Sequence, residues 1–356
     1  MAVEKKRSSN LELYRIICMF MIVCHHFVVN SGLMNIDGPM HNNPESVNTI
    51  FLYLFGMWGK TGINCFLMIT GYFMCTSNIT IRKFVKLMIW IYFYHFIFYG
   101  IFLTTGYETM GFGRLIKLLM PVWGFNSNFT SCFIGFWLTI PFWNILIHNM
   151  TQKQHQMLLV LIVGMYSILV NIPGFYISFN YVTWFGIIYV VASYIRLYPK
   201  PIYEDTKLWT ILSLCTITFA MLSVIFLHYT GISTEYAFVS DSNKFIALAV
   251  AVTTFMLFKN INIPYSKIIN SIGASTFGVL LIHANSDAMR QWLWKDVVNC
   301  VGHFNLSLLH LVAFCFGTVA TIFSICIIID RMRVYAIEKP FFKWYDTKFK
   351  SDVQSK

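Results

Sequence analysis

Four histidines lie inside long apolar stretches and are the residues there best suited to chemistry: His25, His26, His95 and His283. An ionisable side chain inside a membrane-spanning segment is costly, and where it occurs it usually has a function. Imidazole titrates near neutral pH, which suits a general base. None of the 15 acidic residues falls in the middle of an apolar stretch. This excludes a paired-carboxylate site and a carboxylate proton relay at that depth.

Helix geometry distinguishes His26 from its neighbour. Arg15 and His26 are 11 residues apart, which in an α-helix is three turns plus about 20°, with a rise of about 16 Å. The two side chains therefore share one face, whereas His25 is turned roughly 80° away from Arg15. One interpretation is a functional stripe with a cation at the membrane surface and an imidazole at depth. The other is that Arg15 reaches lipid phosphate and His26 bonds a neighbouring helix.

A basic cluster, Arg82, Lys83 and Lys86, follows the second apolar stretch on the same expected side of the membrane as Arg15. Lys83 and Lys86 are three residues apart, so they face one way if they are helical. Such clusters are typical of cytoplasmic loops in general. They also suit a polyanion such as the phosphates of a cytoplasmic cofactor. The cluster and Arg15 place cations at the membrane surface, and His26 lies about 16 Å deeper. This arrangement predicts a ligand that has a charged head and a long, thin reactive arm.

These residues resemble the motifs of the acyltransferase-3 family of integral-membrane acyltransferases. The first span of that family carries a basic residue, ten intervening residues and a histidine, matched here by Arg15 and His26. Lys83 and Lys86 stand where the family has a basic cytoplasmic pair, usually of arginines. Three further segments match in the expected order: 64–73 at the end of the second span, 277–285 with its histidine in the ninth, and 337–340 after the last.

The resemblance implies a donor, an acceptor and a division of roles. The donor is acyl-coenzyme A bound from the cytoplasm, with acetyl-coenzyme A common in the family. The acceptor is a hydroxyl, often on a glycan of the cell surface or on a lipid-linked precursor. We expect Arg15, Arg82, Lys83 and Lys86 to hold the coenzyme A phosphates. We expect His26 to act as general base on the acceptor hydroxyl or to accept the acyl group itself.

Each remaining candidate has two interpretations. His25 either orients His26 or packs against a neighbouring helix, and His283 either lines the site or bonds another helix. Asn285 and Arg290 lie at the outer end of the ninth span. They either bind sugar hydroxyls of the acceptor or form a solvated helix end.

Other polar residues are expected to be structural. His95 lies in an aromatic stretch and is expected to be a satisfied interior group. Glu338 is expected to pin the end of the last helix near the basic loops. The nine cysteines form no CxxC pair and mostly lie in apolar stretches, so they are expected to be small buried side chains. No metal-ligand spacing is present, so no metal is expected.

Composition indicates which elements position these residues. Hydrophobic residues make up 57% of the 356-residue chain and charged residues only 12%, and the mean hydropathy is +0.62. Soluble domains have roughly 25% charged residues, so a soluble globule, a disordered chain and a nucleic-acid module are all disfavoured. Apolar runs of about 20 residues recur, each long enough to cross a hydrocarbon core. The sequence predicts an all-α polytopic membrane protein with about ten transmembrane helices, near residues 11–32, 50–74, 84–105, 129–148, 156–172, 179–197, 208–229, 244–258, 268–286 and 306–330.

The distribution of basic residues predicts the orientation. With ten crossings, 20 of the 26 Lys and Arg residues fall on the side of the N-terminus. The positive-inside rule then places both termini in the cytoplasm, together with a basic tail at 331–356. Residues 1–356 are expected to form a single membrane domain of a bacterial inner membrane. The net charge of +11 is attributed to topology, so no nucleic-acid partner is expected.

Two short segments are expected to lie in the membrane interface. Residues 114–120 form a short amphipathic pattern. Residues 47–58 are either part of the second span or a second interfacial segment. In the latter case the second span begins near Lys60.

Three functions compete for this pattern. The favoured one is an O-acyltransferase that acts on a cell-surface or lipid-linked glycan. The alternative is a glycan or lipid-linked sugar exporter without acyl-transfer activity, which would need a polar path but not the stripe from cation to imidazole. An ion or proton transporter is the weakest, because no acidic residue lies at mid-span.

Overall fold

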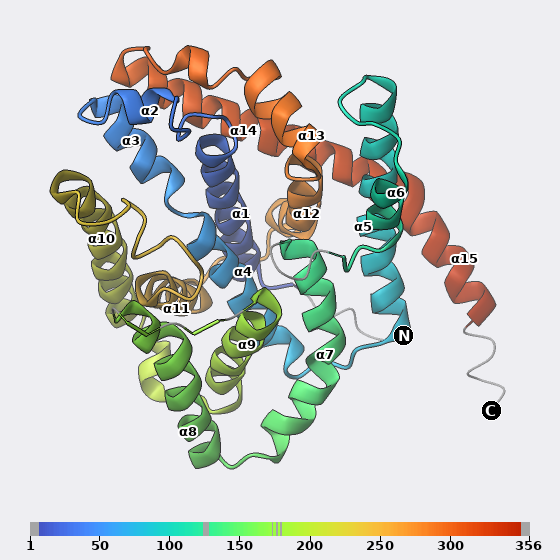
Figure 1. Cartoon of the computed structure of the whole chain (residues 1–356). Coiled ribbons are helices and arrows are strands. Elements are labelled where there is room, and N and C mark those ends of the chain that lie inside the picture. Colours follow the sequence, from blue (N-terminus) through green and yellow to red (C-terminus); the bar gives the residue numbers. More distant parts are fainter. Residues whose placement is uncertain (1–6, 124–127, 173, 176, 179, 350–356) are drawn as a thin grey trace.

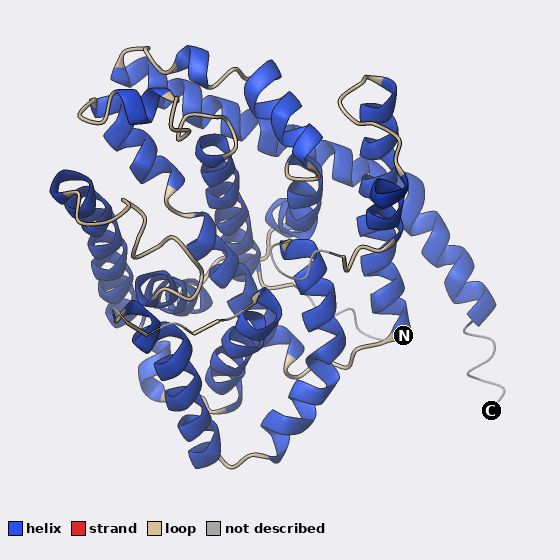
Figure 2. Cartoon of the chain, viewed as in Figure 1, coloured by secondary structure: helices blue, strands red, loops and turns tan. Residues whose placement is uncertain are grey.

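The computed structural model describes residues 7–349 except 124–127, 173, 176 and 179, and the described chain is almost entirely helical (Figures 1 and 2). No β-strand occurs among these residues. The α-helices are α1 (Ser9–Val29), α2 (Pro39–Asn42), α3 (Val47–Gly56), α4 (Gly59–Met74), α5 (Ile81–Thr104), α6 (Phe112–Leu119), α7 (Phe129–Asn149), α8 (Gln152–Val163), α9 (Tyr181–Leu197), α10 (Thr206–Thr230), α11 (Phe245–Asn260), α12 (Lys267–His283), α13 (Asp287–Arg290), α14 (Leu308–Arg333) and α15 (Lys339–Phe349).

Seven helical segments of the described chain are long and apolar enough to cross a membrane. An eighth candidate is the pair Lys267–His283 and Asp287–His303, which is bent by 92°. Two shorter apolar helices, Tyr181–Leu197 and Phe245–Asn260, complete the set. The multi-pass helical architecture is therefore confirmed. Each of the ten predicted ranges overlaps one of these segments, whereas the number of crossings and the sides of the termini stay predictions.

Helix α1 lies at the centre of the bundle (Figure 1) and packs against α3, α4, α11, α12 and α14. Its buried residues come from all around the helix, which is typical of a helix surrounded by other helices. Phe20 contacts Phe323, and Phe27 contacts Phe314, both with ring centroids 6.0 Å apart, so α1 and α14 run antiparallel. The histidines near the end of α1 are therefore held inside the protein rather than against lipid.

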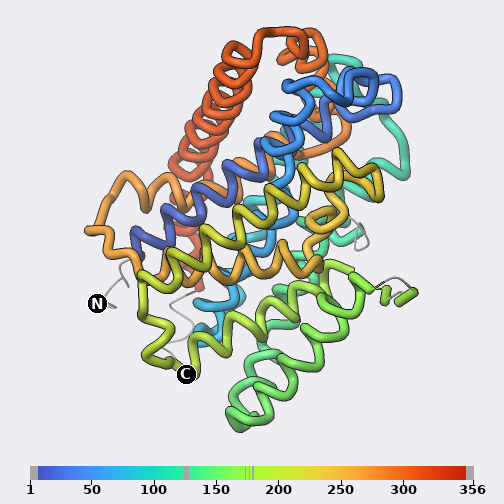
Figure 3. The backbone as a smooth tube through the Cα atoms, turned by 90° about the vertical axis from the view of Figure 1, so that its left-hand side faces the viewer, coloured from blue at the N-terminus to red at the C-terminus, as the bar shows by residue number. Residues whose placement is uncertain are grey.

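Polar contacts gather several helix ends at the face where α1 begins, which we call the N-terminal face. Asn10 donates to the carbonyls of Phe258 and Lys259 at the end of α11, at 2.9 and 3.1 Å. Ser9 donates to Asn270 near the start of α12, at 3.2 Å. Figure 3 shows the start of α1 beside the loop that joins α11 to α12. The α1–α14 contacts place the end of α14 at the same face.

The second predicted span is broken. It consists of α3 and α4, which are separated by Met57 and Trp58. Together the two helices, Val47–Met74, still form one of the seven candidate spans. The placement of residues 47–58 in the membrane interface therefore stays a prediction. The segment predicted at 114–120 is also helical, as α6, and none of its side chains is buried.

The C-terminal region predicted as a basic tail is helical as far as residue 349. Helix α14 continues through a π-helical turn, Val334–Glu338, into α15, so residues 331–349 are helical. Arg333 explains the continuation, because it bonds Asp330 and Glu338, both at 2.9 Å, in a buried setting. These ion pairs bridge successive turns and hold the helix together where it leaves the bundle. Helix α15 contacts α5 through the pair of Arg82 and Asp346 and extends beyond the rest of the bundle (Figure 1).

The cysteines agree with their prediction. All nine are free, and eight are buried, with Cys215 the exposed exception. They act as small apolar side chains at helix contacts.

Candidate functional site

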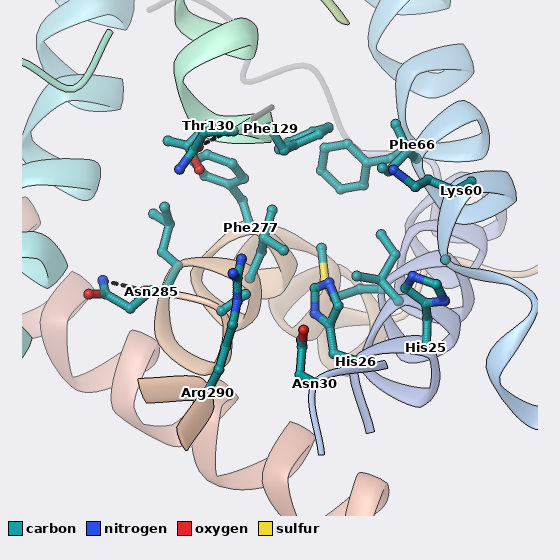
Figure 4. Close-up of a pocket in the computed structure, with 18 of the residues that line it drawn as sticks. His25, His26, Asn30, Lys60, Phe66, Phe129, Thr130, Phe277, Asn285 and Arg290 are labelled. Carbon is teal, nitrogen blue, oxygen red and sulfur yellow. Dashed lines mark hydrogen bonds between the residues drawn. The ribbon is translucent and has the colours of Figure 1, made fainter. Parts of the chain in front are cut away.

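A cavity of about 270 Å³ lies inside the bundle beside the histidines of α1 (Figure 4). Met19, Ile22, His26, Val29 and Asn30 of α1 form one wall, with successive spacings of three, four, three and one residues, as one helix face requires. His25 of α1 lines the cavity as well. The other walls come from the start of α4 and from α5, α7, α9, α12, α13 and the residues next to them: Gly59, Lys60, Ile63, Phe66, His95, Asn128, Phe129, Thr130, Tyr181, Phe277, Leu280, Leu281, Ala284, Asn285 and Arg290.

His26 forms a hydrogen-bonded chain with His283 of α12. Nδ1 of His26 is 2.8 Å from Nε2 of His283, and Nδ1 of His283 is 2.6 Å from the carbonyl oxygen of Val279. The carbonyl can only accept, so Nδ1 of His283 carries a proton and donates it. In a neutral ring, Nε2 of His283 must then accept from Nδ1 of His26. Nε2 of His26 is left with a lone pair and with no hydrogen bond from any described residue.

His25 is bonded elsewhere. Its Nδ1 lies 2.6 Å from the carbonyl oxygen of Gly56, at the break between α3 and α4. Gly59 must be glycine here, because a Cβ would lie 2.2 Å from the His25 ring. The ring that orients His26 is therefore that of His283, and His25 fastens α1 to the end of α3.

Arg15 lies on the same stripe as His26 but outside the cavity. Met19, four residues further along α1, is the innermost α1 residue in the cavity wall. The Arg15 guanidinium sits 5.6 Å from the ring centroid of Phe66, and Phe66 also lines the cavity. The Phe66 ring thus lies between the Arg15 guanidinium and the cavity that holds the His26 imidazole. It blocks the direct path between these two side chains along the face of α1.

Glu12 is a partner of Arg15 that the sequence analysis did not single out. The carboxylate of Glu12 lies 3.2 Å from Arg15 and 3.0 Å from Arg7, and its side chain is only 7% exposed. Nε of Arg15 is buried and has no hydrogen-bond partner in the described chain. The guanidinium therefore keeps one unused donor. Glu12 is three residues before Arg15, a spacing that would have pointed to an ion pair.

The basic cluster at the start of α5 is partly neutralised by the C-terminal helices. Arg82 makes two bonds of 2.9 Å to Asp346, and Lys86 lies 2.6 Å from Glu338. Lys83 instead donates to the carbonyl of Asn78 at 2.6 Å, and no carboxylate of the described chain pairs with it. Glu338 links the last helix to the basic loop, as expected of a structural residue.

Asn285 and Arg290 follow the sharp bend after α12 and lie at the mouth of the cavity. Ser286 caps α13 by accepting from the amide of Met289, which fixes the turn. Arg290 bonds Asp287 at 2.8 Å, and Asn285 donates to the carbonyl of Leu281 at 2.9 Å. Figure 4 shows Arg290 and His26 pointing into the same space, with Asn30 between them.

A wider hollow of about 1020 Å³ lies next to the cavity, and we call it the vestibule. Five residues line both hollows, so the two are continuous. The vestibule is lined by His95, Tyr99, Glu108, Arg114, Lys117, Leu118, Met120, Pro121, Trp123, Asn128, Ser131, Ala284, Asn285, Ser286, Asp287 and Arg290.

Three cavity residues were not predicted from the sequence. Nδ2 of Asn30 is buried without a hydrogen-bond partner in the described chain. Asn30 lies one helical turn after His26, and this spacing is the sequence pattern that could have identified it. Lys60 contacts the hydroxyl of Tyr181 and lies 3.9 Å from Asp241. Nothing local in the sequence indicates that Lys60 and Tyr181 meet, because 121 residues separate them.

His95 differs from its expected role. It lines both the cavity and the vestibule, and the described residues offer its ring no hydrogen bond. It is therefore not a satisfied interior group, but an imidazole at the boundary of the two hollows. As for metals, no group of three or more His, Cys, Asp or Glu residues in the described ranges could hold an ion.

Comparison with protein families gives one match. A family model described as an acyltransferase domain matches residues 8–329, which covers α1 through nearly all of α14. Neither a search of curated proteins nor a search of solved structures gives a match.

Proposed function

The chain belongs to the acyltransferase-3 family and is a multi-pass membrane acyltransferase, and from this premise we propose that it transfers an acyl group from coenzyme A to a hydroxyl of a glycan. The acyl group is acetyl and the donor is cytoplasmic acetyl-coenzyme A. The acceptor is a cell-surface or lipid-linked glycan, and the protein resides in a bacterial inner membrane. The observation that carries this proposal is the chain His26–His283–Val279 at the wall of a cavity.

The proposed topology has ten crossings with both termini in the cytoplasm. Support comes from the N-terminal face, where α1 and α12 begin and α11 and α14 end. Basic residues, among them Arg82, Lys86 and Lys259, lie at the helix ends gathered there, as the positive-inside rule requires of a cytoplasmic side. His26 then lies near the opposite face, about 26 Å along α1 from its start.

In the proposed reaction, Nε2 of His26 takes the proton of the acceptor hydroxyl as its oxygen attacks the thioester carbonyl carbon. The tetrahedral intermediate collapses, the carbon–sulfur bond breaks, and the proton passes to the departing coenzyme A thiolate. His283 is a positioning residue, because it fixes the tautomer in which Nε2 of His26 is the acceptor. Asn30 provides an unpartnered N–H donor in the same wall for the oxyanion.

The same nitrogen supports a second route. Nε2 of His26 attacks the thioester itself, releases the thiolate and forms an acyl-imidazole, which the hydroxyl then attacks. This route separates the two half-reactions in time, so donor and acceptor need not occupy the 270 Å³ cavity together. Both routes require the tautomer that His283 imposes.

We propose that Arg15 and Lys83 are the main contacts of the coenzyme A phosphates. Arg15 has an unused Nε donor, and Lys83 has no carboxylate partner in the described chain. Arg82 and Lys86 contribute less, because Asp346 and Glu338 already offset their charges. The thioester arm reaches His26 past Phe66, which must move aside.

The decisive experiment replaces His26 with asparagine, which keeps a polar side chain but removes Nε2. Ester content of the cell-surface glycan is measured by NMR, and protein abundance by immunoblot of membranes. We expect loss of the esters with normal abundance, whereas His41→Asn, at an exposed histidine of the short helix α2, leaves them unchanged. Normal ester content in His26→Asn would refute the proposed function and favour the exporter alternative.

A further inference from the structure

The vestibule carries more positive than negative charge close to the base. Three cations line it, Arg114, Lys117 and Arg290, against two carboxylates, Glu108 and Asp287. Glu108 pairs with Arg114 and Asp287 with Arg290. Lys117 has no carboxylate partner in the described chain, so one full positive charge is left without an acidic partner.

The pair at Arg290 is also weaker than the distance alone suggests. The Asp287 side chain is 95% exposed, so water screens its attraction for the guanidinium. Nε of Arg290 is buried and has no hydrogen-bond partner in the described part of the chain. Arg290 therefore has a donor left over for a ligand, and it faces both the vestibule and the cavity.

The cavity adds to this excess. Lys60 lies in its wall beside the histidines, and its carboxylate neighbour Asp241 is 3.9 Å away and does not line the cavity. Positive charges that are partly removed from water are costly unless an anion joins them. Lys60 and Arg290 are partly buried, whereas Lys117 is exposed. The described residues give these three cations only Asp241 and Asp287 as acidic neighbours, so an anionic ligand would offset the remaining charge.

We infer that the acceptor is anionic and that it carries a phosphate or carboxylate group bound by Arg290 and Lys117. The inference rests on the proposed function, since it names the class of acceptor for that site. Figure 4 shows Arg290 and His26 pointing into one space. An anion on Arg290 therefore places a hydroxyl of the same or the adjoining sugar unit at His26. Trp123 and Tyr99 line the vestibule and offer aromatic faces for the sugar rings.

The test uses the full chain in nanodiscs of phosphatidylcholine and measures binding of four probes. The probes are a trigalacturonate, which bears carboxylates on sugar, a polyprenyl diphosphate, which bears phosphates on lipid, and the neutral controls maltotriose and polyprenol. We expect at least one anionic probe to bind and to bind more weakly as salt is raised, and neither neutral control to bind. The anionic probe that binds identifies whether the charge is on the glycan or on its lipid carrier.

The residues are tested with Lys117→Ala, Arg290→Gln and the double variant. We expect each single variant to raise the Kd of the anionic probe about tenfold, and Arg290→Lys, which keeps the charge, to raise it less. Lys295→Ala removes an exposed lysine outside both hollows and serves as the matched control. Equal binding of charged and neutral probes by the wild type, or unchanged affinity in the double variant, would overturn the inference.

A further pair of measurements separates this inference from the proposed function. His26→Asn is expected to bind the anionic probe as the wild type does while losing acyl transfer. If the wild type transfers acyl groups but binds no anionic probe, the inference fails and the function stands. If binding occurs only in nanodiscs that contain phosphatidylglycerol, a lipid headgroup occupies the vestibule, and the inference fails as well.

Discussion

The two ends of the membrane-embedded site differ in the acidic partners of their cations. At the start of α5, Arg82 and Lys86 are each bound to a carboxylate of the last helices. Around the cavity, Arg290 has only the exposed Asp287 as an acidic partner. Nδ2 of Asn30 and Nε of Arg290 are buried and have no partner in the described chain, as is also true of Nε of Arg15 at the other end. Buried polar groups are normally hydrogen-bonded, so unpaired ones need an explanation. The cavity end is arranged to receive a ligand, whereas much of the charge at the other end holds helices together.

The largest effect is expected when His283, which fixes the tautomer of His26 at the cavity end, is removed. His283→Ala removes the acceptor for Nδ1 of His26 and frees His26 to adopt the wrong tautomer. We expect kcat to fall about a hundredfold with little change in the KM for acyl-coenzyme A. Initial rates in membrane vesicles with labelled acetyl-coenzyme A measure both constants.

A conservative variant distinguishes positioning from packing. In His283→Gln the amide oxygen can still accept from His26, so we expect at least a tenfold recovery relative to His283→Ala. Equal rates in the two variants, or a rate of His283→Ala within twofold of the wild type, would contradict the role of His283.

A smaller effect is expected at the other end and tests which cations bind the donor. Lys83→Ala removes a cation that has no carboxylate partner, so we expect the KM for acyl-coenzyme A to rise about tenfold with kcat unchanged. Lys86→Ala is the comparison, because Glu338 already pairs with Lys86, and we expect a rise below about threefold. A larger rise in KM for Lys86→Ala than for Lys83→Ala would contradict this assignment. It would mean that the phosphates displace Glu338 and that the paired cations belong to the donor site.

The smallest effect concerns the contact between α5 and α15. Asp346→Asn releases Arg82, whose side chain is 47% exposed. The loss of stability should stay below about 1 kcal/mol, because such pairs are screened by water. The freed guanidinium should lower the KM for acyl-coenzyme A by about twofold. Thermal unfolding in detergent and the vesicle assay measure the two quantities, and a raised KM would show that α15 helps to bind the donor.

The stripe of α1 could be predicted because it depends on helix periodicity alone. The spacing of Arg15 and His26 sets their common face whatever surrounds them. The positions of the apolar helices followed equally well from hydropathy, and so did the burial of most cysteines. These features are local, so one sequence is enough to find them.

The partners of these residues could not be predicted, because they depend on how distant helices pack. The bond from His26 to His283 joins positions 257 residues apart, and the pair Arg82–Asp346 joins positions 264 residues apart. The sequence predicts the basic cluster as a single donor site, because nothing in it reveals that residues 331–349 return as a helix beside α5. Phe66 was likewise noted only as part of a motif, not as the side chain between Arg15 and the cavity.

The carbonyl of Val279 has a consequence for where the two histidines exchange protons. A relay of protons through histidines needs a group at its far end that can release one proton as it takes up another. The amide oxygen that ends the His26–His283 chain has no proton to give. Protons can therefore enter and leave the pair only from the side of His26. In the proposed reaction, the proton that His26 takes from the acceptor hydroxyl consequently returns to the cavity and to the departing thiolate.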